Sequence, residues 1–557
     1  MAYNIADLFE HAVDAVGDRE ALSVDDERRT YRQLDENANR FAHHLAAAAG
    51  IGPGDHVGIY ALNSVEWIEA MLAAFKLRAV PINVNYRYVE DELRYLFDNA
   101  DLAAVVVDRS LAPRLANIRA ELPKLRHAVV VDDPGAPDAG DVLDAVPFHR
   151  ALASGSPERD FGPRSPDDHY ILYTGGTTGM PKGVVWRQED VFMALGGGID
   201  AYTQEPVARE TALAEKAAAT ETPLRSLCLP PLMHGAAQWA VMRFLFDGST
   251  TVLARRFDAH EAWRTIARER INSTMITGDA MGRPLIEALD DLDGEGLDLS
   301  SLFVVASSAA VFSPAVKDRF LARFPNLILV DAIGSTETGA NGMATARPGA
   351  QMRGGPTVQP GRDAVVVDDE LLELAPGEKR IGRLARKGNI PLGYYKDEVK
   401  TRETFVTAPD GTRYVLAGDM ARRELDGTIT LLGRGSGCIN TGGEKVFPEE
   451  VEGVLKAHPR VFDALVVGVP DERWGQRVAA VVQPRDPGGD AGELTLDDID
   501  AHCRTHLAGY KVPRQLTLVG AISRSPSGKP DYPWAQKVAR ADATGAAASA
   551  PLRASAP

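Results

Sequence analysis

The stretch YILYTGGTTGMPKGVVW, residues 170–186, decides how the rest of the chain is interpreted. Its first four residues are typical of a buried strand, which leads directly into a turn rich in glycine and threonine. Backbone N–H groups in such a turn can approach an anion closely, and Lys182 adds a positive charge. The spacing is not that of the GxxxxGK[ST] loop of P-loop hydrolases, because Pro181 precedes the lysine. On this stretch alone, a phosphate-binding loop and a plain turn are about equally supported.

Size and composition limit the classes of protein to consider. The 557 residues, 45% of them apolar, suffice for a large core and more than one domain. The net charge is −17 with Lys and Arg dispersed, so we expect no nucleic-acid partner. Cys228, Cys438 and Cys503 form no CxxC pair, which indicates a reducing compartment. We find no signal peptide and no apolar run of bilayer length, and therefore expect a cytoplasmic protein without a transmembrane segment.

The hydrophobic pattern predicts an α/β fold with two domains. Apolar runs such as HVGIYAL and AAVVVD alternate with helical patterns, which is typical of layered α/β subdomains with parallel strands. From about residue 380 the pattern changes to short strands with glycine-rich turns, which predicts a β-rich subdomain. We expect a large N-terminal domain over residues 1–433, a small mobile α+β domain over 434–538, and a disordered tail over 539–557. Five glycines in residues 433–444 mark the joint.

Four further motifs follow the opening stretch in order along the chain. They are DAIGSTETG (331–339), AGDMARR (417–423), LLGRGSGCINTGGEKVFPEEVE (431–452) and SPSGKPDY (525–532). Together with residues 170–186, they resemble the acyl-adenylate-forming family, which includes acyl-CoA synthetases, luciferases and adenylation domains. In detail, the chain is most similar to actinobacterial fatty-acyl and steroid-acid CoA ligases. An ordered set of five motifs is far more specific than a single glycine-rich loop.

The resemblance implies a reaction in two steps. A carboxylic acid attacks the α-phosphate of ATP and releases pyrophosphate, and coenzyme A then displaces AMP from the acyl adenylate. The implied ligands are therefore ATP, Mg²⁺ and coenzyme A. The residues that the resemblance assigns to ATP are Thr174, Gly175, Gly176, Thr177, Thr178, Gly179, Lys182, Asp331, Ala332, Thr336, Asp419, Arg434 and Lys529.

Three of the implied residues would be catalytic. Glu337, with the hydroxyl of Thr177, would bind Mg²⁺, which needs few protein ligands beside phosphate oxygens. Lys529 would offset the charge that develops at the α-phosphate. His234 would gate the acyl pocket and orient the substrate carboxylate. The alternatives are ordinary: a capping acid for Glu337, a solvated loop lysine for Lys529 and a core histidine for His234.

The resemblance also implies a hinge, a coenzyme A site and an acyl pocket. Ser436 occupies the hinge position, where the family more often has aspartate or lysine. Gly443 would leave room for the pantetheine arm and Lys445 would meet a phosphate, although a strand-edge lysine is an equal alternative. The acyl pocket would be lined by His234, Gly235, Ala236, Trp239, Ser308 and Ala309.

Some features depart from the family pattern. Ser308 and Ala309 lie beside the adenine position, where the family often has Gly-Gly-Ala-Pro, and Ile333 replaces an aromatic residue that often stacks on the base. Residues 200–223 form an Ala/Glu-rich insertion, which we expect to be a surface helix or mobile loop; a cover over a long acyl channel is the alternative.

We therefore predict an ATP-dependent acyl-CoA synthetase acting on a medium- or long-chain fatty acid. A steroid side-chain acid is the alternative substrate, and a catalytically silent protein that binds nucleotides or acyl adenylates is the alternative class. Intact Lys182, Glu337, Asp419, Arg434 and Lys529 favour an enzyme. The missing acidic residue in the predicted acyl pocket argues against an amino-acid substrate. The resemblance leaves a homodimer open.

Overall fold

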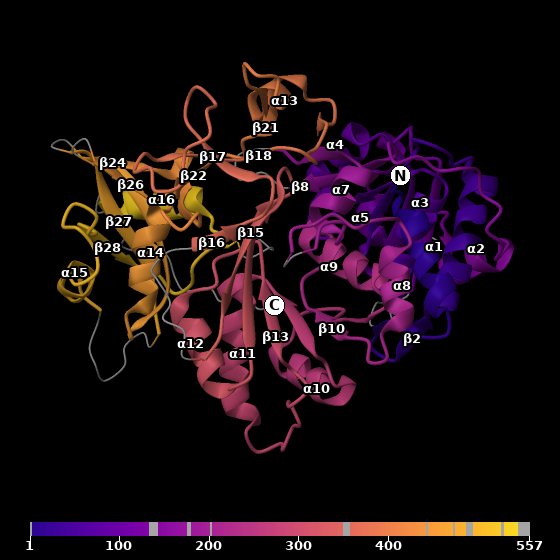
Figure 1. Ribbon diagram of the computed structural model, residues 1–557, viewed down its shortest axis with the longest axis horizontal. Coiled ribbons are helices and arrows are strands. Elements are labelled where there is room, and N and C mark those ends of the chain that lie inside the picture. Colours follow the sequence, from indigo (N-terminus) through magenta and orange to yellow (C-terminus); the bar gives the residue numbers. More distant parts are fainter. Residues whose placement is uncertain are drawn as a thin grey trace.

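The expected α/β architecture is present in the computed structural model, with a large unit and a smaller unit on one side (Figure 1). The residues that the structure describes are 3–132, 143–174, 180–200, 203–348, 357–441, 444–471, 474–485, 494–524 and 529–543; for Arg434, Ser436 and Lys445 it describes the backbone alone. The predicted fold class is confirmed, because parallel α/β sheets, an antiparallel region and a separate α+β unit follow one another along the chain.

The first layer is a parallel sheet of five strands in the order β4-β3-β5-β6-β7. Its strands are β3 (His56–Tyr60), β4 (Val80–Asn83), β5 (Leu102–Asp108), β6 (His127–Val131) and β7 (Val146–Pro147). The helices that precede or connect them are α1 (Ile5–Val16), α2 (Tyr31–Ala49), α3 (Val65–Lys76) and α4 (Glu90–Asn99). Strands β3, β4 and β5 are buried along their whole length, as expected where helices cover both faces of a parallel sheet.

A second, longer sheet changes from parallel to antiparallel at β14 (Ile328–Ser335). Its parallel part consists of β1 (Glu20–Val24), β11 (Thr250–Leu253), β10 (Arg225–Cys228), β12 (Ser273–Ile276), β13 (Val304–Ser307) and β14. The antiparallel part runs through β15 (Gly339–Ala346), β16 (Thr357–Pro360), β23 (Ile429–Arg434), β22 (Asp419–Arg423), β18 (Gly382–Arg386), β21 (Arg413–Val415) and β20 (Phe405–Thr407), with β17 (Ala364–Val367) beside β18. The β-rich region thus begins about forty residues before the predicted start. The sequence of β15, GANGMATA, explains the error, since Gly, Ala and Asn have low β propensity.

The opening stretch of sequence forms a hairpin of its own. Strands β8 (His169–Thr174) and β9 (Lys182–Arg187) pair antiparallel, and β19 (Gly393–Tyr394) adds a third strand beside β9. Thr174 and Lys182 are the last pair of the hairpin, so the glycine-rich stretch is the connection between two strands. Helix α9 (Gly235–Phe246) and α7 (Gln188–Leu195) belong to the same part of the large unit (Figure 1).

The smaller unit has its own sheet and its own core. Its strands are β24 (Ile439–Thr441), β25 (Glu444–Val446), β26 (Val461–Asp471), β27 (Gly475–Pro484) and β28 (Gln515–Leu518), and its helices are α14 (Pro448–Ala457), α15 (Leu496–Arg504) and α16 (Tyr532–Ala543). Helix α16 continues to Ala543, so residues 539–543 of the predicted disordered tail are helical. The unit faces α11 (Gly278–Leu292), where the guanidinium of Arg283 lies over the ring of Phe462 at 4.9 Å.

The insertion at residues 200–223 is docked on the large unit. Its helix α8 (Ala212–Ala219) packs against α1, and Ala217 is fully buried. The guanidinium of Arg19 donates to the carbonyl oxygens of Ala217 (3.3 Å), Thr220 (3.1 Å) and Gly248 (2.9 Å). The predicted helix is therefore present, and these contacts favour a fixed position over a mobile loop.

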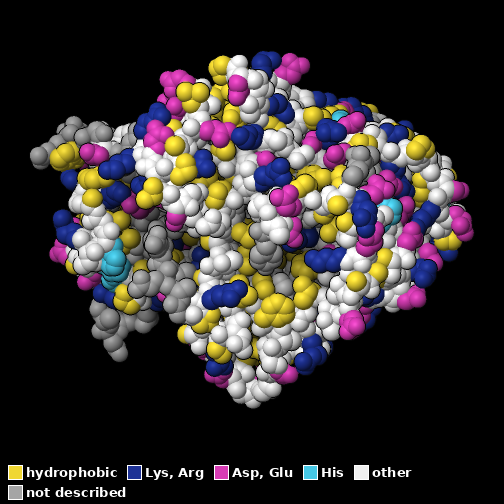
Figure 2. Space-filling view, in the orientation of Figure 1, with side chains coloured by type: hydrophobic (Ala, Val, Ile, Leu, Met, Phe, Trp, Pro, Cys, Tyr) yellow, Lys and Arg dark blue, Asp and Glu magenta, His cyan; other side chains and the backbone are white. Residues whose placement is uncertain are grey.

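The surface agrees with the charge pattern of the sequence. Acidic and basic side chains intermingle over the face shown in Figure 2, and hydrophobic side chains gather near its centre. Within the part of the chain that the structure describes, no helix combines the length and hydropathy needed to cross a bilayer.

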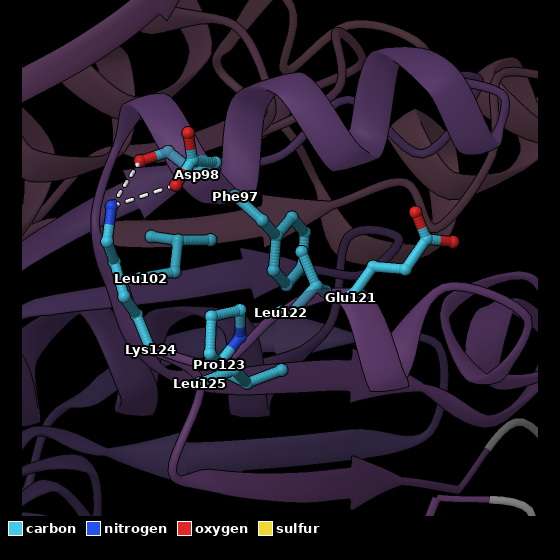
Figure 3. A pocket seen from close by; sticks show the side chains of 8 residues that line it. All are labelled: Phe97, Asp98, Leu102, Glu121, Leu122, Pro123, Lys124 and Leu125. Atoms are coloured by element: carbon cyan, nitrogen blue, oxygen red, sulfur yellow. Dashed lines mark hydrogen bonds and ion pairs between the residues drawn. The ribbon is translucent and has the colours of Figure 1, made fainter.

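A small surface hollow lies between α4 and residues 121–125 (Figure 3). Its volume is about 10 Å³, which is room for one water molecule at most. The ammonium of Lys124 at its rim pairs with Asp98 at 2.8 Å and with Asp101 at 2.8 Å. Because of its size we do not regard this hollow as a substrate site.

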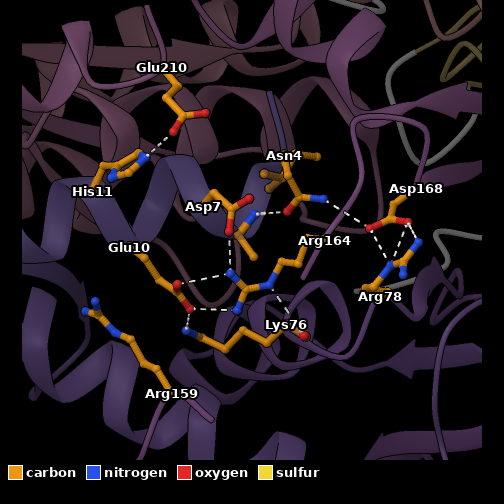
Figure 4. A network of polar contacts seen from close by, with 12 residues as sticks. Asn4, Asp7, Glu10, His11, Lys76, Arg78, Arg159, Arg164, Asp168 and Glu210 are labelled. Atoms are coloured by element: carbon orange, nitrogen blue, oxygen red, sulfur yellow. Dashed lines mark hydrogen bonds and ion pairs between the residues drawn. The ribbon is translucent and has the colours of Figure 1, made fainter. Parts of the chain in front are cut away.

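A buried charge network joins α1, α2 and α3, and Figure 4 shows its part around Glu10, Lys76 and Arg164. The ammonium of Lys76, whose side chain is 0% exposed, donates to Glu10 at 2.5 Å and to Asp35 at 2.7 Å. Arg164 also pairs with Glu10, at 2.9 Å, and Arg159 with Asp35, at 2.8 Å. Burial favours the neutral acid, yet Lys76 and Arg164 hold the pKa of Glu10 below its usual value. The network therefore consists of charged groups that depend on one another.

We predict that Lys76→Met lowers the free energy of unfolding by about 3–5 kcal/mol, because two buried carboxylates lose their shared cation. Lys124→Met is the matched control, since its side chain is 47% exposed and its ion pairs lie at the surface. The control should cost at most about 1 kcal/mol. Urea denaturation of both variants measures the difference, and equal losses would contradict the role given to Lys76.

Candidate active site

The β8–β9 hairpin places two of the predicted ATP residues next to each other. Thr174 and Lys182 are the pair next to the connection between the strands, while Gly175 to Gly179 lie outside the described residues. A β carbon at Gly183 would lie 2.6 Å from the ring of Tyr173, so the hairpin is packed too tightly for a side chain there. This close packing against Tyr173 explains why the residue after Lys182 is glycine.

The ammonium of Lys182 is paired with Asp397, a residue that the sequence did not single out. Asp397 also accepts a hydrogen bond from the backbone N–H of Lys400 at 2.9 Å and so caps helix α13 (Glu398–Thr404). The hydrogen bond from Lys182 lowers the pKa of Asp397, which keeps the carboxylate ionised. Lys182 is therefore oriented by an anion, and its contact with phosphate remains a prediction.

The turn between β14 and β15 carries Thr336 and Glu337 and is fixed by reciprocal hydrogen bonds. The backbone N–H of Ser335 donates to the hydroxyl of Thr338 at 3.0 Å, and the N–H of Thr338 donates back to the Ser335 hydroxyl at 3.2 Å. The indole N–H of Trp186 in β9 donates to the carbonyl of Thr336 at 3.0 Å. The turn is thereby tied directly to the hairpin that carries Lys182.

The carboxylate of Glu337 is oriented by a tyrosine from the β-rich region. The hydroxyl of Tyr394 donates to Oε1 of Glu337 at 3.0 Å. Within the described residues, no cluster of three His, Cys, Asp or Glu side chains could hold a metal ion. A single oriented carboxylate fits Mg²⁺, provided that substrate phosphates supply most of its other ligands.

Asp331, Ala332 and Ile333 all lie in β14, but their environments differ. Asp331 forms an ion pair of 2.7 Å with Lys317, and burial raises its pKa. Its carboxylate is thus already engaged, and Ala332 is held in the ladder opposite Met343. Ile333 packs against the core of the antiparallel region. The side chain of Ile333, which replaces the family's aromatic residue, is therefore held in place by apolar contacts.

The loop after β13 contains the other departure from the family pattern. Ala309 has a φ of +69°, in the left-handed region where glycine carries no steric penalty. The backbone N–H of Ser308 donates to the carbonyl of Ile276 at 3.3 Å, which ties the loop to the neighbouring strand. The backbone thus adopts a conformation that favours glycine, although the residue present is alanine.

Two of the residues that the resemblance assigns to ATP are brought together by the antiparallel region. Asp419 begins β22 and Arg434 ends β23, and the two residues are opposite each other in the ladder. The side chains of Arg434, of Ser436 at the predicted hinge and of Lys445 at the predicted coenzyme A site lie outside the described atoms, as does all of Gly443. The roles assigned to these four residues remain predictions.

His234 is the residue immediately before α9. Burial, followed by the nearby positive charges of Lys529 and Arg87, lowers the pKa of His234 to about 4. Its Nε2 atom is buried and has no hydrogen-bond partner among the described residues. The imidazole is therefore neutral near pH 7 and has a ring nitrogen available for a ligand. The positive charge of Lys529 thus acts on His234 although the two residues are 295 positions apart in sequence.

The start of α9 is pressed against β8. A β carbon at Gly235 would lie 2.2 Å from the Cδ2 methyl of Leu172 in β8, so a larger residue here would force the Leu172 side chain to move. Ala236 is half-buried in the first turn of the helix. Trp239, one turn later, is only 5% exposed and packs edge-on against Tyr170 with ring centroids 5.3 Å apart. Trp239 is thus part of the core of the large unit, and its place in an acyl pocket stays a prediction.

Sequence reasoning missed Tyr394 and Asp397, which orient Glu337 and Lys182. Both lie in the segment GYYKDE, residues 393–398, which runs from β19 to the first residue of α13; Tyr394 ends β19 and Asp397 caps α13. Such a stretch resembles an ordinary surface turn before a helix, with Asp as its cap. Only the pairing of β19 with β9 brings this segment to the hairpin.

Comparison with known proteins supports the same assignment. The AMP-binding enzyme family model matches residues 9–395, and the model for the C-terminal domain of AMP-binding enzymes matches residues 450–529. The 3-oxocholest-4-en-26-oate–CoA ligase of Rhodococcus rhodochrous is 52% identical over 540 residues, which is 96% of each chain. A medium/long-chain-fatty-acid–CoA/3-oxocholest-4-en-26-oate–CoA ligase of Mycobacterium tuberculosis is 53% identical over 537 residues, again 96% of each.

Solved structures share the fold over almost the whole chain. The anthranilate CoA ligase AuaEII in complex with anthranoyl-AMP has a TM-score of 0.82 at 24% identity, covering 98% of both chains. A fatty acyl CoA synthetase of Mycobacterium tuberculosis has a TM-score of 0.69 at 25% identity, covering 97% of this chain and 99% of the other. The resemblance inferred from the five motifs is confirmed: the chain belongs to the AMP-binding enzyme family.

Proposed function

We propose that the protein is an ATP-dependent acid–CoA ligase that activates a medium- or long-chain fatty acid through an acyl adenylate. The observation that carries this proposal is the proximity of Lys529, from the small unit, to the neutral His234 of the large unit, whose Nε2 is unpartnered among the described residues. Relatives that are about half identical over nearly the whole chain are named as CoA ligases, in agreement with the enzyme class expected from the motifs. The silent-protein alternative loses support accordingly.

A steroid side-chain acid is an equally supported substrate. The Rhodococcus relative is named for 3-oxocholest-4-en-26-oate alone, whereas the Mycobacterium relative is named for both that acid and fatty acids. The two relatives are almost equally similar to this chain, so identity does not separate the two acids. Both substrates share an aliphatic carboxylic acid end, which is the part that the proposed chemistry uses.

In the first step, the site must bring two anions together. The glycine-rich connection and Lys182 would hold the β- and γ-phosphates, and Lys182 would exchange Asp397 for phosphate. Glu337 would hold Mg²⁺, with Thr177 as a second ligand; when bound, the ion supplies positive charge to the phosphate oxygens. Asp419 and Arg434 would position the ribose. Together, these groups would orient ATP toward the acid and neutralise the negative charge of its phosphates.

The acid would approach from the side of His234. Because this imidazole is neutral, it can donate a hydrogen bond to the substrate carboxylate without the cost of a buried charge. Lys529 would then supply the positive charge that stabilises the pentavalent α-phosphate in the transition state. Attack of a carboxylate oxygen on phosphorus breaks the bond to the bridging oxygen, so pyrophosphate leaves with that bond's electron pair.

In the second step, coenzyme A would need access to the acyl adenylate that Lys529 faces. We infer that the unit after residue 433 turns about Ser436 and that Gly443 and Lys445 then meet coenzyme A. The thiolate attacks the acyl carbon and AMP leaves with the mixed-anhydride oxygen. A cytoplasmic location and a homodimer are further predictions that rest on the sequence.

Pyrophosphate release with a panel of acids tests the proposed function. Wild-type protein, ATP and Mg²⁺ are incubated with fatty acids of several lengths and with steroid side-chain acids, each with and without coenzyme A. We expect acid-dependent release of pyrophosphate, and AMP plus acyl-CoA when coenzyme A is present. The best acid decides between the two substrates. ATP binding without release for any acid would favour the silent protein.

We predict that Lys529→Ala lowers the rate of adenylate formation by about 100- to 1000-fold, because a charge aimed at the transition state is lost. Thioester formation from supplied acyl adenylate should be spared. Lys537→Ala, which removes an exposed lysine from α16, is the control and should leave both half-reactions unchanged. An equal loss of both half-reactions in Lys529→Ala would remove this residue from the adenylation step.

We predict that Glu337→Ala raises the Mg²⁺ concentration needed for half-maximal pyrophosphate release, because it removes the oriented carboxylate. Glu403→Ala is the control, since Glu403 is 60% exposed on α13 and pairs with Lys400. A magnesium titration of both variants measures the effect. An unchanged titration for Glu337→Ala would show that this carboxylate does not bind the ion.

A further inference from the structure

Asn83 lies where three parts of the large unit meet. It is the last residue of β4, so its backbone belongs to the parallel sheet of the first layer, and it is only 6% exposed. Its side chain leaves that sheet and contacts the end of β8 and the segment before α9. No sequence motif pointed to this residue.

The side-chain amide of Asn83 makes three short hydrogen bonds to backbone groups. Its oxygen accepts from the N–H of Tyr173 at 2.8 Å, and its NH₂ group donates to the carbonyls of Tyr173 at 2.8 Å and Met233 at 2.7 Å. Both amide protons are therefore used. Tyr173 immediately precedes Thr174, and Met233 immediately precedes His234. The Asn83 side chain thus holds two residues: Tyr173, next to Thr174 of the proposed ATP site, and Met233, next to His234, where the acid would bind.

Other contacts hold the same two backbones against each other. Gly235 allows α9 to approach Leu172 of β8 closely. The hydroxyl of Tyr170 donates to Gln238 at 2.8 Å, and the amide of Gln238 in turn donates to the carbonyl of Leu232 at 2.8 Å. Among these contacts, only Asn83 bonds directly to the residues that adjoin Thr174 and His234.

We propose that Asn83 is a positioning residue for adenylate formation, which fixes the separation between the ATP-binding hairpin and the His234 segment. This role rests on the proposed function. The substrate carboxylate and the α-phosphate must meet in line, so an error of about 1 Å in this separation costs about 100-fold in rate. The second half-reaction needs no ATP phosphates on the hairpin and should depend less on Asn83.

Asn83→Asp is the sharpest variant because it preserves shape. The carboxylate lacks both N–H donors and would face the carbonyl oxygens of Tyr173 and Met233. Buried acceptors without donors repel one another, so the two segments should separate. Asn83→Ser is a milder second variant, since its hydroxyl retains one donor.

Asn272→Asp is the matched control. The Asn272 side chain likewise accepts from a backbone N–H, that of Arg225 at 2.9 Å, and donates to a backbone carbonyl, that of Ser301 at 3.3 Å. Arg225 begins β10, whereas His234 follows the carboxyl end of the same strand. The control substitution therefore disrupts the same kind of hydrogen bond, from an asparagine side chain to the backbone, but at the end of β10 that is far from His234.

The experiment measures both half-reactions and thermal stability for wild type and for the three variants. We expect Asn83→Asp to lower acid-dependent pyrophosphate release by about 100-fold, with a smaller loss for Asn83→Ser and with thioester formation from supplied acyl adenylate nearly retained. Asn272→Asp should leave the ratio of the two half-reactions unchanged. As the pH is lowered, the carboxylate that the Asn83→Asp change introduces takes up a proton and regains a donor, so the activity of this variant relative to wild type should rise.

Two results would overturn the positioning role: an equal loss of both half-reactions in folded Asn83→Asp and Asn83→Ser, or full adenylation in both. If Asn83→Asp does not fold, the ratio in Asn83→Ser decides. Absence of pyrophosphate release in the wild type with every acid is a different result, since it removes the proposed function and the positioning role with it.

Discussion

The start of α9 packs closely against β8, because residue 235 is glycine and leaves the Leu172 side chain in place; a β carbon there would lie 2.2 Å from its Cδ2 methyl. This close approach sets the distance between β8 and the His234 segment. At the end of the same strand, Asn83 bonds to both backbone groups of Tyr173. Strand β8 is therefore fixed by two independent sets of contacts, and the connection that follows it begins at a defined point.

The other active-site groups are arranged outward from this hairpin. Trp186 in β9 ties the Thr336–Glu337 turn to it, and β19, paired with β9, brings Tyr394 and Asp397 to Glu337 and Lys182. These contacts link the parallel sheet, the hairpin and the antiparallel region. A site for a polyanionic substrate is thus assembled from segments that carry single charges, in a protein whose net charge is −17.

The two units contribute groups of different charge to the proposed site. His234, on the large unit, is half-buried with a buried Nε2 and is neutral, its pKa lowered to about 4, whereas Lys529 contributes a positive charge from the small unit. A neutral donor can remain in a buried pocket throughout a cycle, because it carries no cost of desolvating a charge. A charge that is needed in only one step is better placed on a part that can move, and this is consistent with the hinge proposed near Ser436.

The sequence by itself determined the family, through five ordered motifs, and the α/β fold class, through its hydrophobic pattern; the site residues that the motifs assign remain predictions. The early start of the antiparallel region at β15, the docking of α8 and the contacts of Tyr394, Asp397 and Asn83 could not be predicted in this way. A single Tyr, Asp or Asn has many ordinary uses, and its partners are far away in sequence. Only the tertiary structure decided those contacts, since hydrogen bonds and ion pairs depend on distances that folding sets.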